Sequence, residues 1–288
     1  SKPRRASEVG GQLMASVGLP SVPVAVGALD LAAMMTGVGL NAPGDMCLIL
    51  GTTAVLSYIK SPTPFLSPPV AATVHHPITG DWIRVLAPQS GASAFDWFAA
   101  LHPNSFGGTD AGEIAAKINE IAQHVPPGAN GVMFLPFLTG ERAPFVAPEA
   151  AASFLGMHAS TTNADLARAV MEGTGLSLRH CLHVEDIPSP ERVVLTGGGA
   201  RNPLWCQIIA DIIGVTVLAN AGEDHGLWGA ALIGGGATGA LDPMVAHRDE
   251  EFAVYTPDPT AHTAYDKLFA TYLKTIEASR AIWTAMRT

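Results

Sequence analysis

Three consecutive glycines, Gly197, Gly198 and Gly199, follow a run of β-favouring residues, Val193–Thr196. Two residues separate them from an Asn-Pro pair, Asn202 and Pro203. Asn202 can accept hydrogen bonds from free N–H groups at a helix start, and Pro203 suits the first helical position. Glycines let a ligand lie directly against the backbone, and a helix start offers N–H groups and the positive end of a dipole. The order strand, glycine turn and helix favours a nucleotide-type site, while a tight turn that binds nothing explains this stretch alone equally well.

The glycine spacing separates this stretch from two common nucleotide motifs. A Walker A loop is excluded because no Gly-Lys-Ser/Thr follows the glycines. A dinucleotide fingerprint is excluded because the glycines are contiguous, whereas that motif spaces them as G-x-G-x-x-G. The stretch therefore indicates a nucleotide site of another kind, or a purely structural turn.

Two further glycine turns stand at the ends of predicted strands. Gly51 precedes Thr52 and Thr53, whose hydroxyl and N–H groups suit phosphate oxygens, although an ordinary hairpin turn explains them equally well. Asp30 follows a bend at Gly27, which is a suitable place for a general base. An aspartate that caps the next helix explains Asp30 as well.

The elements that would position these residues alternate between strands and helices. Apolar patterns predict strands over residues 22–26, 46–50, 54–59, 71–74, 82–86, 131–135, 193–196 and 216–218. Helical spacing and cap signals predict helices over residues 3–17, 93–101, 109–124, 163–185 (with Asn163 as N-cap), 203–213, 226–239 and 260–286, and a helix that starts at residue 31. Residues 61–69 are a Pro-rich loop. This alternation predicts an α/β fold with a mixed sheet flanked by helices.

The composition limits the class of protein. The 288 residues suffice for one large domain or two small ones, and 48% hydrophobic against 14% charged residues indicates extensive burial. A net charge of −9 without a basic run argues against a nucleic-acid partner and an anionic membrane surface. Three widely separated cysteines, Cys47, Cys181 and Cys206, fit a reducing cytoplasm, and no apolar run has transmembrane length.

Two other groups of residues have structural interpretations. Four glycines fall within one predicted helix and indicate very close packing on the sheet or on a ligand, and we favour packing alone; they are Gly229, Gly234, Gly235 and Gly236. Four histidines form two pairs, His75 with His76 and His180 with His183. No carboxylate joins either pair at metal-ligand spacing, so we interpret them as surface or core histidines and expect no metal ligands among the side chains.

Five motifs, in chain order, resemble those of the FGGY carbohydrate kinase family, which includes xylulose and glycerol kinases. Gly27–Ala33 resembles the catalytic-aspartate segment, Leu50–Leu56 the phosphate hairpin, Ser90–Trp97 the helix start that faces the nucleotide, Leu135–Pro144 the second signature and Thr196–Trp205 the adenosine motif. The resemblance extends over nearly the whole chain. It implies actin-like ATPase (RNase H-like) domains, with the sugar bound mainly to the first and ATP mainly to the second.

The resemblance also implies a role for each candidate residue. Asp30 would contact the substrate and take the proton from its attacking hydroxyl, with Mg²⁺ neutralising charge on the phosphates of ATP. The cofactor-binding residues would be Gly51, Thr52 and Thr53 at the phosphates, Gly91 in the nucleotide cleft, Gly197, Gly198 and Gly199 under the adenine or ribose, and Asn202 at the base. For Arg142 we favour a structural contact, either an ion pair with Glu141 or a bond to the loop that holds the signature.

Two departures from the family pattern qualify the expected function. The family's chains are far longer and carry an N-terminal Asp-x-Gly-Thr turn, so residues 1–43 are interpreted as the end of the first domain and residues 44–288 as the nucleotide-binding domain. This chain alone is therefore expected to bind ATP or ADP weakly and not to be a competent kinase. Leu31 stands where xylulose and glycerol kinases carry an amide, which leaves the substrate open and is weakly closer to the L-xylulose or erythritol kinase branch.

The expected function is ATP-dependent phosphorylation of a sugar or polyol hydroxyl, on a pentulose or an alditol. The alternatives are an actin/Hsp70-type nucleotide-binding module and an inactive, truncated regulator. The expected partner is the small-molecule sugar or polyol, with neither nucleic acid nor membrane, and self-association into a homo-oligomer is left open.

Overall fold

The computed structural model describes residues 4–14, 16, 18, 20–60, 70–101, 106, 110–185, 187, 190–222, 224–244 and 251–286. The chain divides into two compact units. The first unit consists of residues 1–47, 57–85 and 222–251, and the second of residues 48–56, 86–221 and 252–288. This division follows contacts between residues, and the domain boundary after residue 43 stays a prediction. The predicted loop at residues 61–69 lies outside the described residues.

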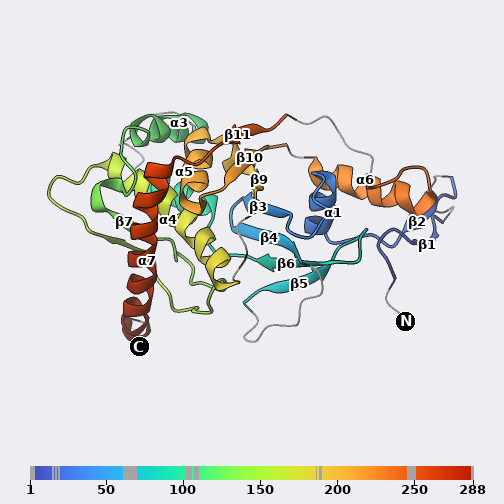
Figure 1. Ribbon diagram of the computed structural model, residues 1–288, viewed down its shortest axis with the longest axis horizontal. Coiled ribbons are helices and arrows are strands. Elements are labelled where there is room, and N and C mark those ends of the chain that lie inside the picture. Colours follow the sequence, from blue (N-terminus) through green and yellow to red (C-terminus); the bar gives the residue numbers. More distant parts are fainter. Residues whose placement is uncertain are drawn as a thin grey trace. The chain divides into compact units, whose positions relative to one another are not determined.

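The described strands form a seven-stranded sheet and two small two-stranded ones (Figure 1). The order in the large sheet is β11 (Ala253–Tyr255), β10 (Thr216–Ala219), β9 (Arg192–Thr196), β3 (Met46–Leu50), β4 (Ala54–Lys60), β6 (Trp82–Leu86) and β5 (Ala72–His75). Strands β9 and β10 are parallel, whereas β10 with β11 and β5 with β6 are antiparallel. The predicted mixed sheet is therefore confirmed, although the short strand β11 was not predicted.

In the second unit, the long helix α4 (Asn163–Val184) lies at the centre of the helical packing. It contacts α2 (Ala92–Leu101), α3 (Ala111–Ala122), α5 (Pro203–Ile213) and α7 (Pro259–Met286). Helix α4 also packs on β7 (Met133–Leu135), which pairs with the unpredicted strand β8 (Ser153–Leu155). Strand β7 begins two residues later than predicted, because a 3₁₀ turn, η2, occupies Ala129–Gly131. None of the described helices is both long enough and apolar enough to cross a membrane.

A buried polar network joins α4 to α7. Glu172 Oε1 accepts hydrogen bonds from Arg168 Nε at 2.8 Å, from Tyr265 Oη at 2.7 Å and from the N–H of Gly128 at 3.0 Å. Arg168 Nη2 also donates to Tyr265 Oη at 2.8 Å. Because a buried charge is tolerated only when it is paired and hydrogen-bonded, this network fixes α7 against α4 at one register.

Local signals account for the ends of α5 and α4. Asn202 caps α5 by accepting from the N–H of Trp205 at 3.1 Å, and Gly214 ends it with a left-handed φ of 70°, as predicted. For α4 the predicted cap, Asn163, was wrong by one residue. Thr162 is the N-cap, because its side chain and that of Asp165 form a reciprocal capping box.

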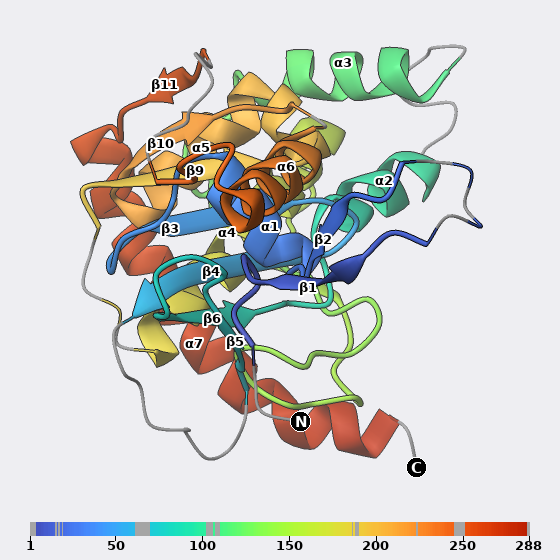
Figure 2. The ribbon, with the colours of Figure 1, turned by 90° about the vertical axis from the view of Figure 1, so that its right-hand side faces the viewer.

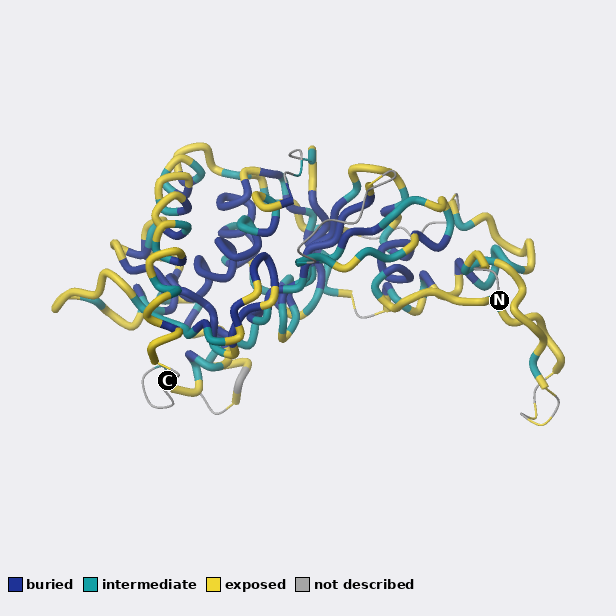
Figure 3. Tube along the Cα trace, turned by 90° about the horizontal axis from the view of Figure 1, so that it is seen from below, coloured by how far each residue is buried: buried dark blue, intermediate teal, exposed yellow. Residues whose placement is uncertain are grey.

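The predicted helix over residues 3–17 was wrong. Val9–Gln12 forms strand β1, which pairs antiparallel with β2 (Pro23–Ala25), a strand that was predicted. Gly10 and Gly11 each lower helix stability by about 1 kcal/mol relative to alanine. A Cβ atom at Gly10 would lie 3.4 Å from the carbonyl oxygen of Val24, so the missing side chain suits close strand pairing. Both strands are largely exposed, as the yellow segment near the N-terminus in Figure 3 shows.

In the first unit, helices α1 (Asp30–Gly37) and α6 (His225–Thr238) lie side by side with their backbones in contact (Figure 2). A Cβ atom at Gly229 would overlap the carbonyl group of Ala33 and lie 3.0 Å from the nitrogen of Gly37. A Cβ at Gly37 would in turn overlap the carbonyl of His225. The predicted close packing of Gly229 is therefore confirmed, but its partner is α1 and not the sheet.

The other three glycines of α6 differ in their surroundings. Cβ atoms at Gly235 and Gly236 would meet the side chains of Leu241 and Pro243, whereas one at Gly234 would meet nothing within 4 Å. Gly234 therefore provides a matched control in the same helix for the effect of Gly229.

We expect Gly229→Ala to lower the free energy of unfolding by about 1–3 kcal/mol, the usual cost of overpacking, because α1 and α6 must separate. Gly234→Ala should be neutral or stabilising by up to about 1 kcal/mol, since alanine favours the helix and the space is open. Urea unfolding of both variants would measure the difference. Equal stabilities would contradict the backbone contact.

Candidate functional site

The turn Gly51–Thr53 joins β3 to β4, and the start of α2 is seated on it. The N–H groups of Gly91 and Ser93 donate to the carbonyl oxygen of Thr52 at 3.1 and 3.2 Å, and the N–H of Ala92 donates to that of Gly51 at 2.7 Å. A Cβ atom at Gly91 would lie 2.6 Å from the nitrogen of Ala54. Gly91 is therefore glycine because the backbone of the turn occupies the space where a side chain would begin.

The turn also presents two threonine hydroxyls. Thr52 is exposed and Thr53 half-buried. Within the described part of the chain, neither hydroxyl has a hydrogen-bond partner. Since a hydroxyl can both donate and accept, these groups are available to a ligand oxygen.

Of the three consecutive glycines, two pack against Leu50 and one does not. Gly197 has a left-handed φ of 88°, and a Cβ there would lie 2.9 Å from the carbonyl oxygen of Leu50. A Cβ at Gly199 would lie 2.9 Å from the Cβ of Leu50. Gly198 is exposed, and a Cβ added to it would meet nothing within 4 Å. Packing on β3 accounts for Gly197 and Gly199, whereas Gly198 faces open space.

Asn202 follows the glycines and has both polar atoms of its side chain engaged. Its Oδ1 accepts from the N–H of Trp205, and its Nδ2 donates to Asn119 Oδ1 at 2.8 Å. The capping role is confirmed. A contact with a nucleotide base, which stays a prediction, would use the second N–H of the amide.

Asp30 lies in the first unit, whereas the eight predicted cofactor-binding residues all lie in the second. It is the first residue of α1, its side chain is exposed, and its Oδ1 accepts from the N–H of Leu31 at 2.7 Å. A carboxylate in the first turn is favoured by the positive end of the helix dipole. One oxygen is thus held by the helix, and the other has no partner among the described residues.

The Gly140–Pro144 segment is held by a buried carboxyl group. Glu141 is 3% exposed, and its Oε1 accepts from the N–H groups of Gln89, Arg142 and Ala143 at 2.9, 2.8 and 3.3 Å. Arg142 Nε donates to the carbonyl of Ala87 at 2.7 Å, so its contact is structural but is made to the segment before α2, and no ion pair with Glu141 is found among the described residues. Sequence reasoning missed the role of Glu141, and the available signal was one acidic residue in a stretch that is largely apolar apart from Thr139 and Arg142.

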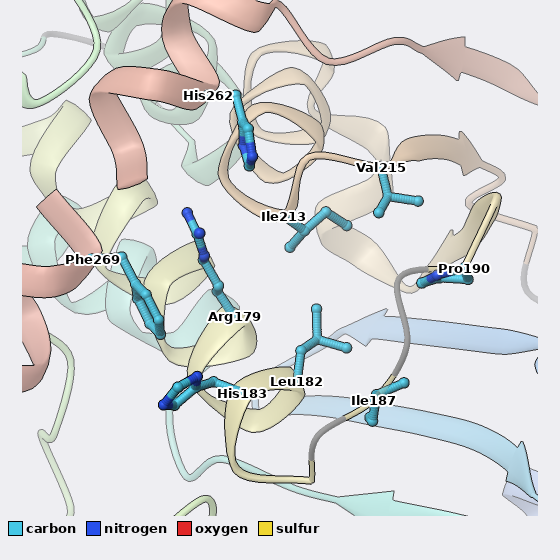
Figure 4. A pocket seen from close by; sticks show the side chains of 9 residues that line it. All are labelled: Arg179, Leu182, His183, Ile187, Pro190, Ile213, Val215, His262 and Phe269. Atoms are coloured by element: carbon cyan, nitrogen blue, oxygen red, sulfur yellow. The ribbon is translucent and has the colours of Figure 1, made fainter. Parts of the chain in front are cut away.

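A cavity of about 290 Å³ lies elsewhere in the second unit, lined by residues from α4, α5 and α7 and their connections (Figure 4). None of the predicted cofactor-binding residues lines it. Arg179 contributes a guanidinium group to the cavity wall. Its Nη2 lies 2.5 Å from Asp266 Oδ1, and its Cζ lies 4.6 Å from the ring centre of Phe269. The charge of Arg179 is therefore already compensated within the protein.

The histidines have structural surroundings. His76 is buried, and its Nδ1 accepts from the N–H groups of Ile78 and Thr79 at 3.3 and 3.2 Å. His180 packs among aromatic rings that include those of Phe145 and Tyr272, and burial lowers its pKa to about 4. Among the described residues, no three His, Cys, Asp or Glu side chains are grouped so that they could hold a metal ion.

Comparison with known proteins identifies relatives of this arrangement. Residues 46–238 match the profile described as the FGGY family of carbohydrate kinases, C-terminal domain. A xylulose kinase of Escherichia coli K12 is 37% identical over 229 residues, covering 76% of this chain and 45% of that protein. A xylulose kinase of Klebsiella pneumoniae is 36% identical over 273 residues, covering 87% and 54%. The chain thus spans about half the length of the curated relatives it matches.

Solved structures of similar fold agree. The xylulose kinase from Rhodospirillum rubrum superposes with a TM-score of 0.85 at 28% identity, covering 98% of this chain and 57% of that one. A gluconate kinase from Lactobacillus acidophilus, at 23% identity, has the same fold with a TM-score of 0.85 over 98% and 58%. The predicted actin-like ATPase fold is therefore confirmed, and the chain belongs to the FGGY family of carbohydrate kinases.

Proposed function

We propose that this protein acts in the ATP-dependent phosphorylation of a hydroxyl group on a sugar or polyol. The observation that carries the proposal is the gathering of Gly51–Thr53, Gly91 and Gly197–Gly199 around one strand end in a carbohydrate-kinase family member. Relatives named xylulose kinase and gluconokinase support a small polyhydroxylated substrate. The choice among such substrates depends on residues such as Leu31, which has no hydrogen-bonding side chain.

The proposed nucleotide site uses the groups that packing leaves free. Gly198 would let the adenine or ribose lie flat against the backbone, because it is exposed and no atom occupies the space above it. The hydroxyls of Thr52 and Thr53 would bind phosphate oxygens, since they have no partner among the described residues. Mg²⁺, when bound with ATP, would neutralise charge on the phosphates. Gly91, Gly197 and Gly199 would act by shaping the site.

Asp30 is the proposed general base. Its carboxylate would accept the proton from the attacking hydroxyl as the new bond to phosphorus forms. Exposure of the side chain leaves it accessible to a substrate, and the hydrogen bond from the Leu31 N–H fixes one of its oxygens. The other oxygen would therefore be the one that receives the proton.

Two further proposals concern the organisation of the protein and its surroundings. Residues 1–43 would be the end of a substrate domain that carries Asp30, and residues 44–288 the nucleotide-binding domain. The three cysteines are buried and none of them forms a disulfide bond, which supports a reducing compartment such as the cytoplasm.

Substitution of Gly198 tests the nucleotide site. We expect Gly198→Val to change the free energy of unfolding by less than about 1 kcal/mol, because its Cβ begins in open space. The rise in Tm on adding saturating Mg-ADP should largely disappear, since the stabilisation of the native state by a ligand depends on the affinity of that state for the ligand. Gly11→Val, at an open glycine of the first unit, should keep the full shift. An undiminished shift in Gly198→Val would mean that the glycine turn is structural.

Substitution of Asp30 tests the proposed base. In a full-length enzyme that contains this sequence, we expect Asp30→Asn to lower kcat by about 10²–10⁴-fold, the usual contribution of a general base, with little change in nucleotide affinity. Glu8→Gln removes an equal charge from an exposed residue of the same unit, whose side chain has one partner among the described residues, Arg4 on the surface, and this variant should leave kcat unchanged. A coupled assay of sugar phosphorylation measures both variants, and wild-type kcat in Asp30→Asn would exclude Asp30 as the base.

A further inference from the structure

Glu141 reaches from the signature loop to a distant segment of the chain. Its Oε1 accepts from the N–H of Gln89, 52 residues earlier, at 2.9 Å, and Arg142 Nε holds the carbonyl of Ala87 at 2.7 Å. The side chains of Glu141 and Arg142 thus form hydrogen bonds with the backbone at both ends of segment 87–89. After Ser90, this segment is followed by Gly91, whose N–H donates to the carbonyl oxygen of Thr52.

The loop that presents Glu141 is itself held in place. Glu141 and Ala147 exchange two backbone hydrogen bonds of 2.9 Å each. Gly140 has a left-handed φ of 78°, and a Cβ there would lie 2.7 Å from the carbonyl oxygen of Pro148. Because the loop backbone is fixed on both sides of Glu141, the carboxyl group can transmit that fixed position to Gln89.

We propose that Glu141 is a positioning residue of the nucleotide site: its carboxylate fixes segment 87–89 and thereby seats Gly91 and the start of α2 on the Gly51–Thr53 turn. The inference rests on the proposed nucleotide-binding function of that turn. Glu141 itself does not contact the nucleotide in this scheme. Its effect passes through Gln89 and Gly91 to the carbonyl of Thr52.

The protonation of Glu141 gives this role a measurable signature. Burial raises the pKa of Glu141 to about 7, against the opposing effect of the three N–H donors and of Arg142. Its Oε2 is buried and has no hydrogen-bond partner among the described residues. The facing titratable groups are Cys181 on α4 and Tyr272 on α7, and burial raises the pKa of both well above the usual values, so both stay neutral near pH 7.

As pH rises, the contribution of Glu141 to the free energy of unfolding should fall, whereas its hold on segment 87–89 should strengthen. The folded protein holds a proton on Glu141 between pH 4.5 and about 7, where the unfolded chain has lost it, so this contribution to stability is lost as pH rises through that window. The ionised carboxylate, however, accepts stronger hydrogen bonds than the neutral acid. The hydrogen bond from the N–H of Gln89 to Glu141 should therefore strengthen as pH rises through the same range, and nucleotide affinity should rise with it.

The test compares Mg-ADP affinity at pH 6, 7 and 8 in the wild type, Glu141→Gln and Glu149→Gln. Glutamine keeps the shape of the side chain but cannot titrate, while Glu149 is a nearby half-buried carboxylate with no hydrogen bond among the described residues. We expect the wild-type Kd to fall from pH 6 to pH 8 by about fivefold more than that of Glu141→Gln, the size of one strengthened charge-assisted hydrogen bond. Glu149→Gln should follow the wild type, and the titration of ADP itself is common to all three.

Equal pH profiles for the wild type and Glu141→Gln would overturn the inference while leaving the nucleotide site intact. Absence of ADP binding to the wild type at every pH would instead contradict the proposed function. Amide hydrogen exchange provides a readout without nucleotide: Glu141→Gln should raise exchange at Gln89 and Gly91 above pH 7, but not in the centre of α7. Unchanged exchange at Gln89 would also overturn the inference.

Discussion

The backbone of the Leu50–Thr53 segment leaves no room for side chains beside it, and the arrangement of the second unit depends on this constraint. Gly91 approaches from the start of α2, while Gly197 and Gly199 approach from the end of β9. Any larger residue at these positions would meet a carbonyl, an amide or the side chain of Leu50. A sheet and a helix can therefore meet at one point with their backbones almost touching, and an exposed glycine, Gly198, remains beside that point.

In the first unit, glycines likewise allow close backbone contact, here between two helices. Gly37 and Gly229 allow α1 and α6 to cross with backbone against backbone, and α1 is the helix that begins with Asp30. Helix packing usually separates axes by 8–10 Å because side chains fill the space, so a glycine at each side of the crossing is needed for closer approach. The position of the proposed base is thus set by the partner helix as well as by the strand that precedes it.

Local signals made some elements predictable and others not. Helix α5 could be read in full, because Asn202, Pro203 and Gly214 each mark an end by their own chemistry. The start of α4 was misplaced, since Asn163 and Thr162 are both good caps and the choice depends on the reciprocal bond of Asp165. Strand β1 was mistaken for a helix: Gly10 and Gly11 are a local signal against a helix, but the strand itself depends on pairing with β2.

The glycine turns of the candidate site could be found from sequence, but which glycine packs against the protein and which faces open space could not. Whether Gly197 or Gly198 faces a ligand depends on where Leu50 lies, and that residue is remote in the chain. The same holds for Glu141, whose principal distant partner is a backbone N–H that has no side-chain signature. Contacts to backbone are invisible to residue-type patterns, so this part of the site required the structure.

The energetics of Glu141 indicate that it serves more than packing. Burying a carboxyl group costs free energy, and leaving one of its oxygens without a partner adds to that cost. An apolar side chain of similar size would avoid both costs, but it could not accept from three N–H groups that belong to two separate segments. Retaining the acid therefore trades stability for a fixed relation between the signature loop and segment 87–89, and that segment leads to the turn where we place the phosphates.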